Sequence, residues 1–427
     1  MQKITARHSQ PLFNVAATRR IEQLAASALP PHMLMQRAGL AVARLTMALA
    51  PHSQRIWIAC GPGNNGGDGF EAALHLHRWG KAVVLTWTGP GFGKTTLPPD
   101  AQAAREQALA AGVPMAEQPP ENFDFCIDAL LGIGAALDAE RPGSAQITRW
   151  LHLMHASHMP RLAVDIPSGL DADTGQSGLE TPSGTIKSIA ADSRTHWAKG
   201  IFTLNLLTLK PGLFTAQGRD CAGQVWFDDL GVDAAAYAQP DAWLLGAHRA
   251  ALPSRLNAMH FTHKGSFGDV AVLGGESRPD SHMAGATLLA ARAALHAGAG
   301  RVFVALLVEP GQNALTVDVA QPELMFRSPD ALELKHQVLV CGCGGGEAVK
   351  AVLPKVLSTA TRLVLDADAL NAIATDSGLQ SLLAASLQRG YGTVLTPHPL
   401  EAARLLGITT AGVQADRLAA ARQLAEK

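Results

Sequence analysis

The sequence lacks any run of about 20 apolar residues, and it lacks an excess of charge of either sign. The first absence argues against a membrane-spanning helix. The 35 Lys and Arg are balanced by 36 Asp and Glu, and no long basic run occurs, so nucleic acid and anionic membranes are not expected partners. Five cysteines without framework spacing favour reduced thiols, and residues 1–20 lack the features of a signal peptide. We therefore expect a cytoplasmic protein that acts on a small molecule.

An alternation of strand-like and helix-like segments fills the 427 residues. Apolar strand candidates at 55–60, 81–87, 123–130 and 161–167 are separated by helical patterns, and the same rhythm resumes after an irregular stretch near 234–241. This pattern predicts two α/β domains, over 1–233 and 242–427. The first is expected to be a Rossmann-like three-layer α/β/α domain, with ligands bound at the carboxyl ends of its parallel strands.

A glycine-rich stretch, GPGNNGGDGF, follows the first of these strands. Gly61, Gly63 and Gly66 fit G-x-G-x-x-G, which indicates a dinucleotide-binding turn. The next strand ends in Thr-Trp-Thr rather than in an acidic residue that could hold a ribose, which argues against an ordinary dehydrogenase. A second glycine-rich stretch, residues 89–96, is one residue short of a Walker A spacing and is interpreted as a loop.

Three glycine-flanked polar clusters stand at predicted strand ends, in segments 64–68, 128–134 and 165–169. A single strand-end aspartate is usually a helix cap or a turn residue. Three such clusters should meet at one edge of a parallel sheet and form a site for a large, polar, phosphate-bearing ligand. Side-chain oxygens of Asn65, Asp128 and Ser168 would suit a hard cation.

The motifs GPGNNGGDGF, DALLGIG and VDIPSGLDADTG closely resemble NAD(P)H-hydrate epimerase. Downstream, HKGSFGDVAVLGG, LVLDADALN and TPHPLEAARLLG resemble ADP-dependent NAD(P)H-hydrate dehydratase, which implies a ribokinase-like second domain. The order is similar to that of the bifunctional NAD(P)H-hydrate repair enzymes. This resemblance implies an isomerase that interconverts the R and S hydrates of NADH and NADPH, joined to a lyase that uses ADP to dehydrate the S form.

The resemblance also implies site residues. Asp165 would contact the hydrated ring and is the candidate general acid/base. Potassium would be held by Asn65, Asp128 and Ser168. The dehydratase substrate would be bound by Ala286, Gly346 and His398, with ADP and Mg²⁺ as cofactors, although His398 alone would be interpreted as a loop histidine between two prolines. The epimerase substrate would be bound by Asn64, Asn65, Gly66, Gly67, Asp68, Gly132, Ile133, Gly134, Ala135, Ala136, Leu137, Asp138 and Asp165.

The sequence departs from the family pattern in its second half. A family turn G-P-G-L-G is GCGGG here, at 342–346, and 193–202 resembles an insertion. The family's K-G-x-x-T loop and G-T-G-D motif are absent, so we expect a chain truncated after Lys427 in which the dehydratase domain is incomplete and has no meaningful ADP-dependent activity. Alternatives are a non-catalytic nucleotide-binding scaffold and a small-molecule kinase of the ribokinase type. Self-association within the family suggests a homo-oligomer.

Overall fold

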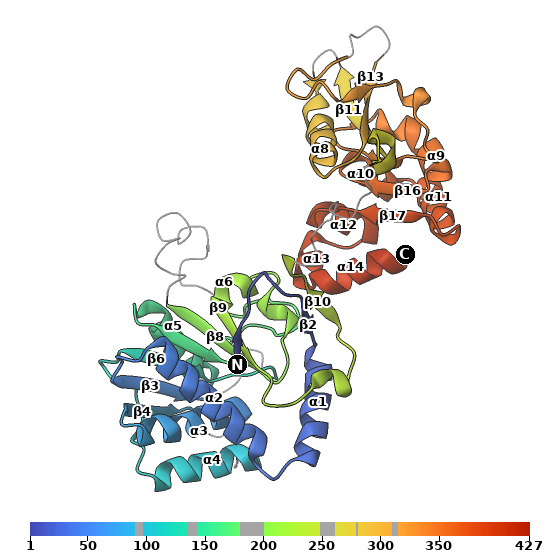
Figure 1. Cartoon of the computed structure of the whole chain (residues 1–427). Helices are drawn as coiled ribbons and strands as arrows, with labels where there is room; N and C mark the ends of the chain where they lie inside the picture. Colours follow the sequence, from blue (N-terminus) through green and yellow to red (C-terminus); the bar gives the residue numbers. More distant parts are fainter. Residues whose placement is uncertain (90–96, 135–142, 180–199, 248–260, 279–280, 310–314) are drawn as a thin grey trace. The chain divides into compact units, whose positions relative to one another are not determined.

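The computed structural model describes residues 1–89, 97–134, 143–179, 200–247, 261–278, 281–309 and 315–427. The chain divides into two compact units, Met1–Ala251 and Leu252–Lys427, coloured blue to green and yellow to red in Figure 1. Each unit has a mainly parallel sheet with helices packed against it, which confirms the prediction of two α/β domains. The first unit extends past the predicted boundary near 234–241, because a strand at Ala242–Leu244 pairs with one at Gln10–Leu12.

The first unit is built on an eight-stranded sheet with the order β1-β9-β8-β7-β6-β3-β4-β5. All neighbours pair in parallel except β1, which runs antiparallel to β9. The strands are β1 (Gln2–Lys3), β3 (Arg55–Cys60), β4 (Ala82–Trp87), β5 (Met115–Ala116), β6 (Phe125–Ala129), β7 (Arg161–Val164), β8 (Ile201–Leu206) and β9 (Gln224–Asp228), with β2 (Gln10–Leu12) and β10 (Ala242–Leu244) forming a separate pair. The helices are α1 (Val15–Ala28), α2 (Met33–Leu49), α3 (Asn64–Arg78), α4 (Pro99–Ala110), α5 (Ser144–Ala156) and α6 (Gly218–Ala222), with short 3₁₀ turns η2 (Pro211–Leu213) and η3 (Ala234–Ala236).

Alternating apolar side chains from the strands fill a core on each face of this sheet. On one face, Ile56 and Ile58 of β3 pack with the inner sides of α1 to α4. On the other face, Trp57 packs with Trp150 of α5, and its indole Nε1 donates to Thr86 Oγ1 at 2.8 Å. This three-layer arrangement explains why β3 and β6 are apolar on both sides.

The strand order reverses between β3 and β6. From β3 the chain moves outward through β4 and β5, and from β6 it moves the other way through β7, β8 and β9. In open parallel sheets a crevice forms at this position, beyond the carboxyl ends of the two strands. The glycine-rich stretch follows β3 and the DALLGIG motif follows β6, so the fold brings both motifs to this crevice.

The central strand β8 was not predicted. Its residues lie in the irregular segment IFTLNLLTLKPG, directly after 180–199, which are outside the described residues and include most of the predicted insertion. The loop at 90–96 is also outside them. β8 is buried between β7 and β9, and such an apolar run is hard to distinguish from a buried helix by periodicity alone.

The second unit has a sheet with the order β14-β13-β11-β15-β16-β17, and the short β12 pairs with β11. All pairs on the main path are parallel, while β12 is antiparallel. The strands are β11 (Asp269–Arg278), β12 (Ser281–His282), β13 (Arg301–Val308), β14 (Met325–Phe326), β15 (Val338–Cys341), β16 (Arg362–Leu365) and β17 (Gly392–Leu395). The helical segments are η5 (Lys264–Phe267), α8 (Ala284–His296), η6 (Pro329–Ala331), α9 (Val349–Thr359), α10 (Asp368–Thr375), α11 (Ser377–Gln388), α12 (Pro399–Leu406), α13 (Thr410–Ala415) and α14 (Arg417–Glu426).

Candidate active site

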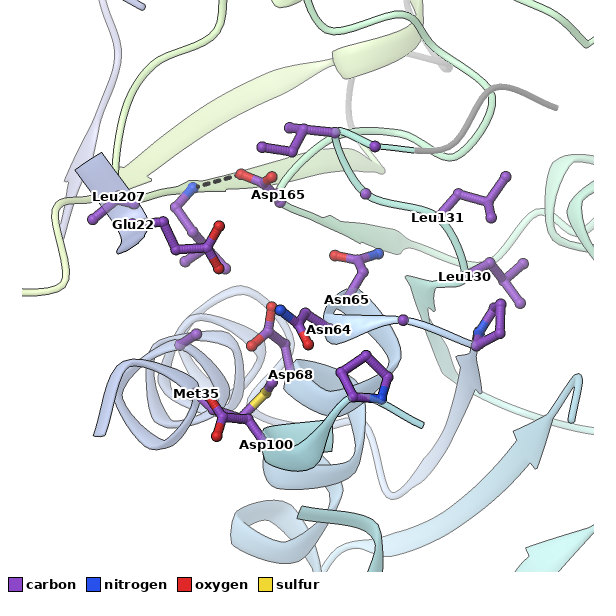
Figure 2. Close-up of a pocket in the computed structure, with 18 of the residues that line it drawn as sticks. Glu22, Met35, Asn64, Asn65, Asp68, Asp100, Leu130, Leu131, Asp165 and Leu207 are labelled. Atoms are coloured by element: carbon purple, nitrogen blue, oxygen red, sulfur yellow. Dashed lines mark hydrogen bonds between the residues drawn. The ribbon is translucent and has the colours of Figure 1, made fainter. Parts of the chain in front are cut away.

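A cavity of about 730 Å³ opens at the reversal of strand order in the first unit. This volume lies in the range of about 300 to 1,000 Å³ that is usual for small-molecule and cofactor sites. Its lining comes from the segments that follow β3, β6, β7 and β8, and from helices α1, α2 and α4. Figure 2 shows polar side chains from several of these segments turned toward one another.

The glycine-rich stretch forms a helix start rather than a loop. Gly63 is the N-cap, and α3 begins at Asn64, so residues 64–68 make up its first turn and a half. Asn64, Asn65 and Asp68 line the cavity, whereas Gly66 and Gly67 do not. The first amides of a helix have no intrahelical acceptor, so this N-terminus can bind an anionic group.

The glycines allow close contact between α3 and the protein itself. A Cβ atom at Gly66 would lie 2.2 Å from the Gly61 carbonyl oxygen, and one at Gly67 would lie 2.6 Å from Met35 Cε. At Gly69 it would lie 2.7 Å from Ala129 Cβ. The absent side chains at Gly66 and Gly69 therefore let the helix pack tightly on the ends of β3 and β6, and the absent side chain at Gly67 lets it pack against α2 and α4.

Asp165, immediately after β7, has a left-handed backbone with φ of 65°. Its Oδ1 accepts three hydrogen bonds, from Lys210 Nζ at 2.5 Å, Asn205 Nδ2 at 3.0 Å and the Leu206 amide at 3.1 Å. Figure 2 shows the lysine contact as a dashed line. Lys210 is 1 % exposed, so the ion pair is buried beside the cavity. Strained residues of this kind occur where surrounding structure holds them, often at functional sites.

Asp128 and Ser168 lie in contact behind the cavity wall. The Ser168 hydroxyl donates to Asp128 Oδ1 at 2.6 Å, and its amide donates to Oδ2 at 3.0 Å. Burial raises the pKa of the Asp128 carboxyl above its usual value, while the hydrogen bonds from Ser168 oppose this shift. The third predicted ligand, Asn65, lines the cavity with both side-chain amide atoms buried and without a partner in the described part of the chain. It lies against Gly132, close to the Leu131 amide that donates to Ser168 Oγ at 2.8 Å.

Two further carboxyl groups line the cavity, those of Glu22 on α1 and Asp68 on α3. Burial raises the pKa of both groups, and the charge of Asp165 raises each further. Lys210 opposes the shift in both cases, and Arg19 opposes it for Glu22. The Arg19 guanidinium extends toward the loop after β6, where a Cβ atom at Gly134 would lie 2.6 Å from its Nη2. The cavity therefore combines a concentration of acidic groups with one cationic group at the loop.

Most of the predicted epimerase residues lie at this cavity. Some residues at or beside the cavity were not predicted from the sequence. Gly132, Ile133 and Gly134 line it, whereas Ala135, Ala136, Leu137 and Asp138 lie outside the described residues. The residues not predicted are Arg19, Glu22, Asn205 and Lys210. For the last two a signal was available, because Asn205 and Lys210 are the amide-bearing and charged residues within the otherwise apolar or hydroxyl-bearing run IFTLNLLTLK.

The predicted dehydratase residues lie near the carboxyl edge of the second sheet. Ala286 is exposed in the first turn of α8, and it lies against Gly344. Gly346 has φ of 54°, and its amide donates to Asp368 Oδ2 at 2.9 Å. His398 caps α12, with Nδ1 accepting from the Leu400 amide at 3.1 Å. The described contacts do not bring Ala286, Gly346 and His398 together.

The GCGGG turn requires backbone that favours glycine. Gly342, Gly344 and Gly346 all have positive φ, between 54° and 116°. A Cβ atom at Gly346 would lie 2.1 Å from Glu276 Oε2, so close packing also excludes a side chain there. The turn is therefore defined by three glycines, even though the family's proline is replaced by Cys343.

The fold and the position of the site are typical of a nucleotide-binding α/β/α domain, which is joined here to a second α/β domain. A family model described as YjeF-related protein N-terminus matches residues 31–193, and one described as NAD(P)H-hydrate dehydratase matches 270–427. The chain is similar to the bifunctional NAD(P)H-hydrate repair enzyme Nnr of Escherichia coli, with 35% identity over 92% of this chain and 71% of that protein. It is similar to Nnr of Coxiella burnetii, with 33% identity over 97% and 80%, and to the repair enzyme of Leishmania braziliensis, with 32% over 100% and 77%. The chain belongs to the family of bifunctional NAD(P)H-hydrate repair enzymes, and both domains of that family are present.

Among the described helices, none has both the length and the apolar character needed to cross a bilayer.

Proposed function

We propose that this chain repairs hydrated NADH and NADPH by epimerising their R and S hydrates in its first domain. The second domain is proposed to be of the type that dehydrates the S form with ADP, and the assay below tests the expectation, from the absent G-T-G-D motif, that it has no meaningful ADP-dependent activity. The observation that carries the proposal is the buried Asp165–Lys210 pair beside a nucleotide-sized cavity, in a chain that belongs to this family. The alternatives of a non-catalytic scaffold and a small-molecule kinase are outcomes of the test below.

In the first domain, Asp165 is proposed to contact the hydrated ring at the end of β7. The α3 N-terminus, with Asn64 and Asn65, would hold phosphate groups, since its amides and dipole favour an anion. Gly132 and Gly134 would line the same ligand. Lys210 is proposed to fix the Asp165 carboxylate, because its ammonium is buried and anchored to the Leu206 carbonyl oxygen at 2.7 Å.

The residues present fit a potassium site. Asn65 has a buried amide without a partner, and Asp128 is a buried carboxylate with no cationic side chain hydrogen-bonded to it in the described structure. Oxygens of Asn65, Asp128 and Ser168 would hold the ion. When bound, the ion supplies positive charge that offsets ligand phosphates.

Replacement of Asp128 by Asn is expected to abolish stabilisation by potassium. If potassium binds only the folded protein, a hundredfold excess over its Kd stabilises by about 2.7 kcal/mol. Melting curves in potassium chloride and tetramethylammonium chloride at equal ionic strength measure this difference. Asp124→Asn is the matched control, because Asp124 is a partly exposed carboxylate just before β6 that accepts from the backbone amides of Gln54 and Arg55. Equal potassium responses in wild type and Asp128→Asn would contradict the assignment.

Replacement of Arg19 by Ala is expected to raise KM for the hydrated cofactor with little change in kcat. Arg19 is proposed to bind a ligand phosphate near Gly134, and a hydrogen bond to a charged group contributes about 1.5 to 3 kcal/mol, equivalent to at least about tenfold in KM. Steady-state kinetics provide the measurement. Arg20→Ala is the control, since Arg20 is an exposed neighbour on α1 outside the cavity lining. A similar KM in both variants would refute the role.

In the second domain, Ala286, Gly346 and His398 are proposed to bind the S hydrate, with ADP and Mg²⁺ as cofactors. Support comes from the family model over 270–427 and from the proximity of these residues to the strand ends where ligands of parallel sheets bind. The Nδ1 of His398 accepts from the Leu400 amide in the helix cap, and its Nε2 lies 3.1 Å from Glu401 Oε1.

One assay tests the whole proposal. Purified chain is incubated with separated R and S hydrates of NADH, with and without ADP, and epimers are resolved by chromatography while reduced-cofactor absorbance is followed. Interconversion of the epimers without ADP is expected. Return of NADH in the presence of ADP would overturn the expectation that the second domain lacks meaningful ADP-dependent activity. Ligand binding without turnover would instead support a scaffold, and ATP-dependent phosphorylation of a sugar or vitamin would support a kinase.

The cellular setting is also a proposal. The five cysteines are free thiols, which is consistent with a reducing, cytoplasmic compartment. The partner is proposed to be the hydrated cofactor alone, with no nucleic acid and no membrane, and the chain is proposed to self-associate. Size-exclusion chromatography with light scattering measures the last point.

A further inference from the structure

Three carboxyl groups face the same cavity but have unequal hydrogen-bond partners. Asp165 Oδ1 accepts from an ammonium, a side-chain amide and a backbone amide. For Glu22 and Asp68 the described residues supply no hydrogen-bond donor, only burial and the charges of neighbours. Figure 2 shows Glu22, Asp68 and Asp165 with their carboxyl groups within the same cavity. Donors stabilise a carboxylate, whereas burial without donors stabilises the protonated acid.

The charges around Asp68 reinforce this difference. Burial raises its pKa well above the usual value, and Asp165 raises it further, followed by Glu22 and by Glu71 one turn along α3. Lys210 opposes the shift but is already paired with Asp165. Arg19 on α1 also lines the cavity, as does Asp100 on α4, whose Oδ1 lies 2.6 Å from His32 Nδ1. The Cys60 thiol at the end of β3 is buried behind the cavity; burial raises its pKa, and the charge of Asp68 contributes to this shift.

On the basis of the proposed function, we propose that Asp68 is the proton donor of epimerisation, while Asp165 stays a carboxylate that stabilises a cationic intermediate. In this scheme one cavity holds both a proton donor, Asp68, which is buried without hydrogen-bond donors among the described residues, and a carboxylate, Asp165, which accepts three hydrogen bonds. In many active sites with two carboxyl groups, one environment favours the protonated acid and the other favours the carboxylate. The first group then donates a proton, and the second stabilises positive charge.

In the proposed reaction, water leaves C6 of the hydrated ring and then adds back to its other face. The hydroxyl on C6 of the hydrated ring takes a proton from Asp68, the C6–O bond breaks with its electron pair on oxygen, and water leaves. The N1 lone pair forms a C6=N1 bond, and the iminium cation is stabilised by Asp165. Water then adds to the opposite face of C6, the electron pair returns to N1, and the proton lost by that water restores Asp68. No oxidation or reduction occurs, and only the configuration at C6 has changed.

Glu22 is a positioning residue in this scheme. Its negative charge favours the proton on Asp68, and it approaches from a different helix, α1. Removal of that charge should make Asp68 a stronger acid. Because the protonated form is required, activity is lost as pH rises through the pKa of Asp68, and in Glu22→Gln this loss should begin at lower pH.

The test is the pH dependence of kcat for R-to-S conversion, corrected for the spontaneous rate, in wild type, Asp68→Asn and Glu22→Gln. Wild type should lose activity about tenfold per pH unit on its alkaline side. Asp68→Asn should lower kcat by about 10²- to 10⁴-fold, without an alkaline fall in the residual rate. Glu22→Gln should shift the alkaline fall to lower pH. Glu106→Gln, an exposed change on α4, is the matched control and should leave the profile in place.

The inference is overturned if Asp68→Asn raises KM but keeps kcat and the alkaline fall, since Asp68 would then only bind ligand. It is also overturned if Glu22→Gln leaves the alkaline fall where it is, a readout that holds even if Asp68→Asn does not fold. An inactive wild type with normal melting behaviour contradicts the proposed function itself and is thereby distinguished from failure of this proton assignment.

Discussion

Asp165→Asn is expected to slow epimerisation by about 10²- to 10³-fold, the loss typical when preorganised electrostatic stabilisation is removed from a transition state. Asparagine has nearly the same size, and it tolerates the left-handed backbone that Asp165 adopts, so the fold should be retained. What would be lost is the negative charge at the position proposed to contact the reacting ring. The expected signature is a fall in kcat with a smaller change in KM.

The measurement is kcat from chromatographic separation of the epimers, with thermal unfolding as a check of the fold. Asp220→Asn is the control, because Asp220 is exposed on α6 and does not line the cavity. A folded Asp165→Asn variant with a near-normal kcat would remove Asp165 from the mechanism.

Lys210→Met is expected to destabilise the first domain by about 3 to 5 kcal/mol, the cost usually found when one partner of a buried ion pair is removed. Lys210 is 1 % exposed, and its ammonium contacts Asp165 Oδ1 and the Leu206 carbonyl oxygen. Without the lysine, the largely buried Asp165 would keep its left-handed backbone, and its negative charge would be uncompensated by a cation. Urea denaturation of the first domain measures the change.

A double-mutant cycle provides the control for this prediction. Combining Lys210→Met with Asp165→Asn removes the uncompensated charge, so much of the stability should return while activity does not. Strict additivity of the two free-energy changes would show that the pair is not coupled in the folded state.

Sequence reasoning located the parts of the site that follow strands with clear apolar patterns. Asn64, Asp128 and Asp165 each come just after or at the end of such a strand, and the parallel sheet carries them to one edge. Arg19 and Glu22 could not be found in this way. They lie on α1, more than a hundred positions before Asp165, and reach the cavity only because that helix packs beside the crevice.

The start of α3 was misjudged for a physical reason. Glycine and asparagine have poor intrinsic helix propensity, so a stretch containing them is naturally interpreted as a turn. Here tertiary packing prevails, because Gly66, Gly67 and Gly69 let the helix approach Gly61, Met35 and Ala129. Lys210 was missed because it lies in the loop after β8, a strand whose residues gave no clear pattern.

The close approach of α3 to the sheet has a consequence for how its variants should behave. Helix α3 carries both the Asp68 carboxyl and the N-terminal amides that are proposed to hold phosphate. The distance between the helix and the sheet at the glycines therefore sets the position of both groups relative to Asp165. An alanine at Gly69 would push this helix away from the sheet as a unit and displace the phosphate-binding and acidic groups together. Along the inner face of α3, the substitutions that lower stability should therefore be the same ones that lower catalytic activity.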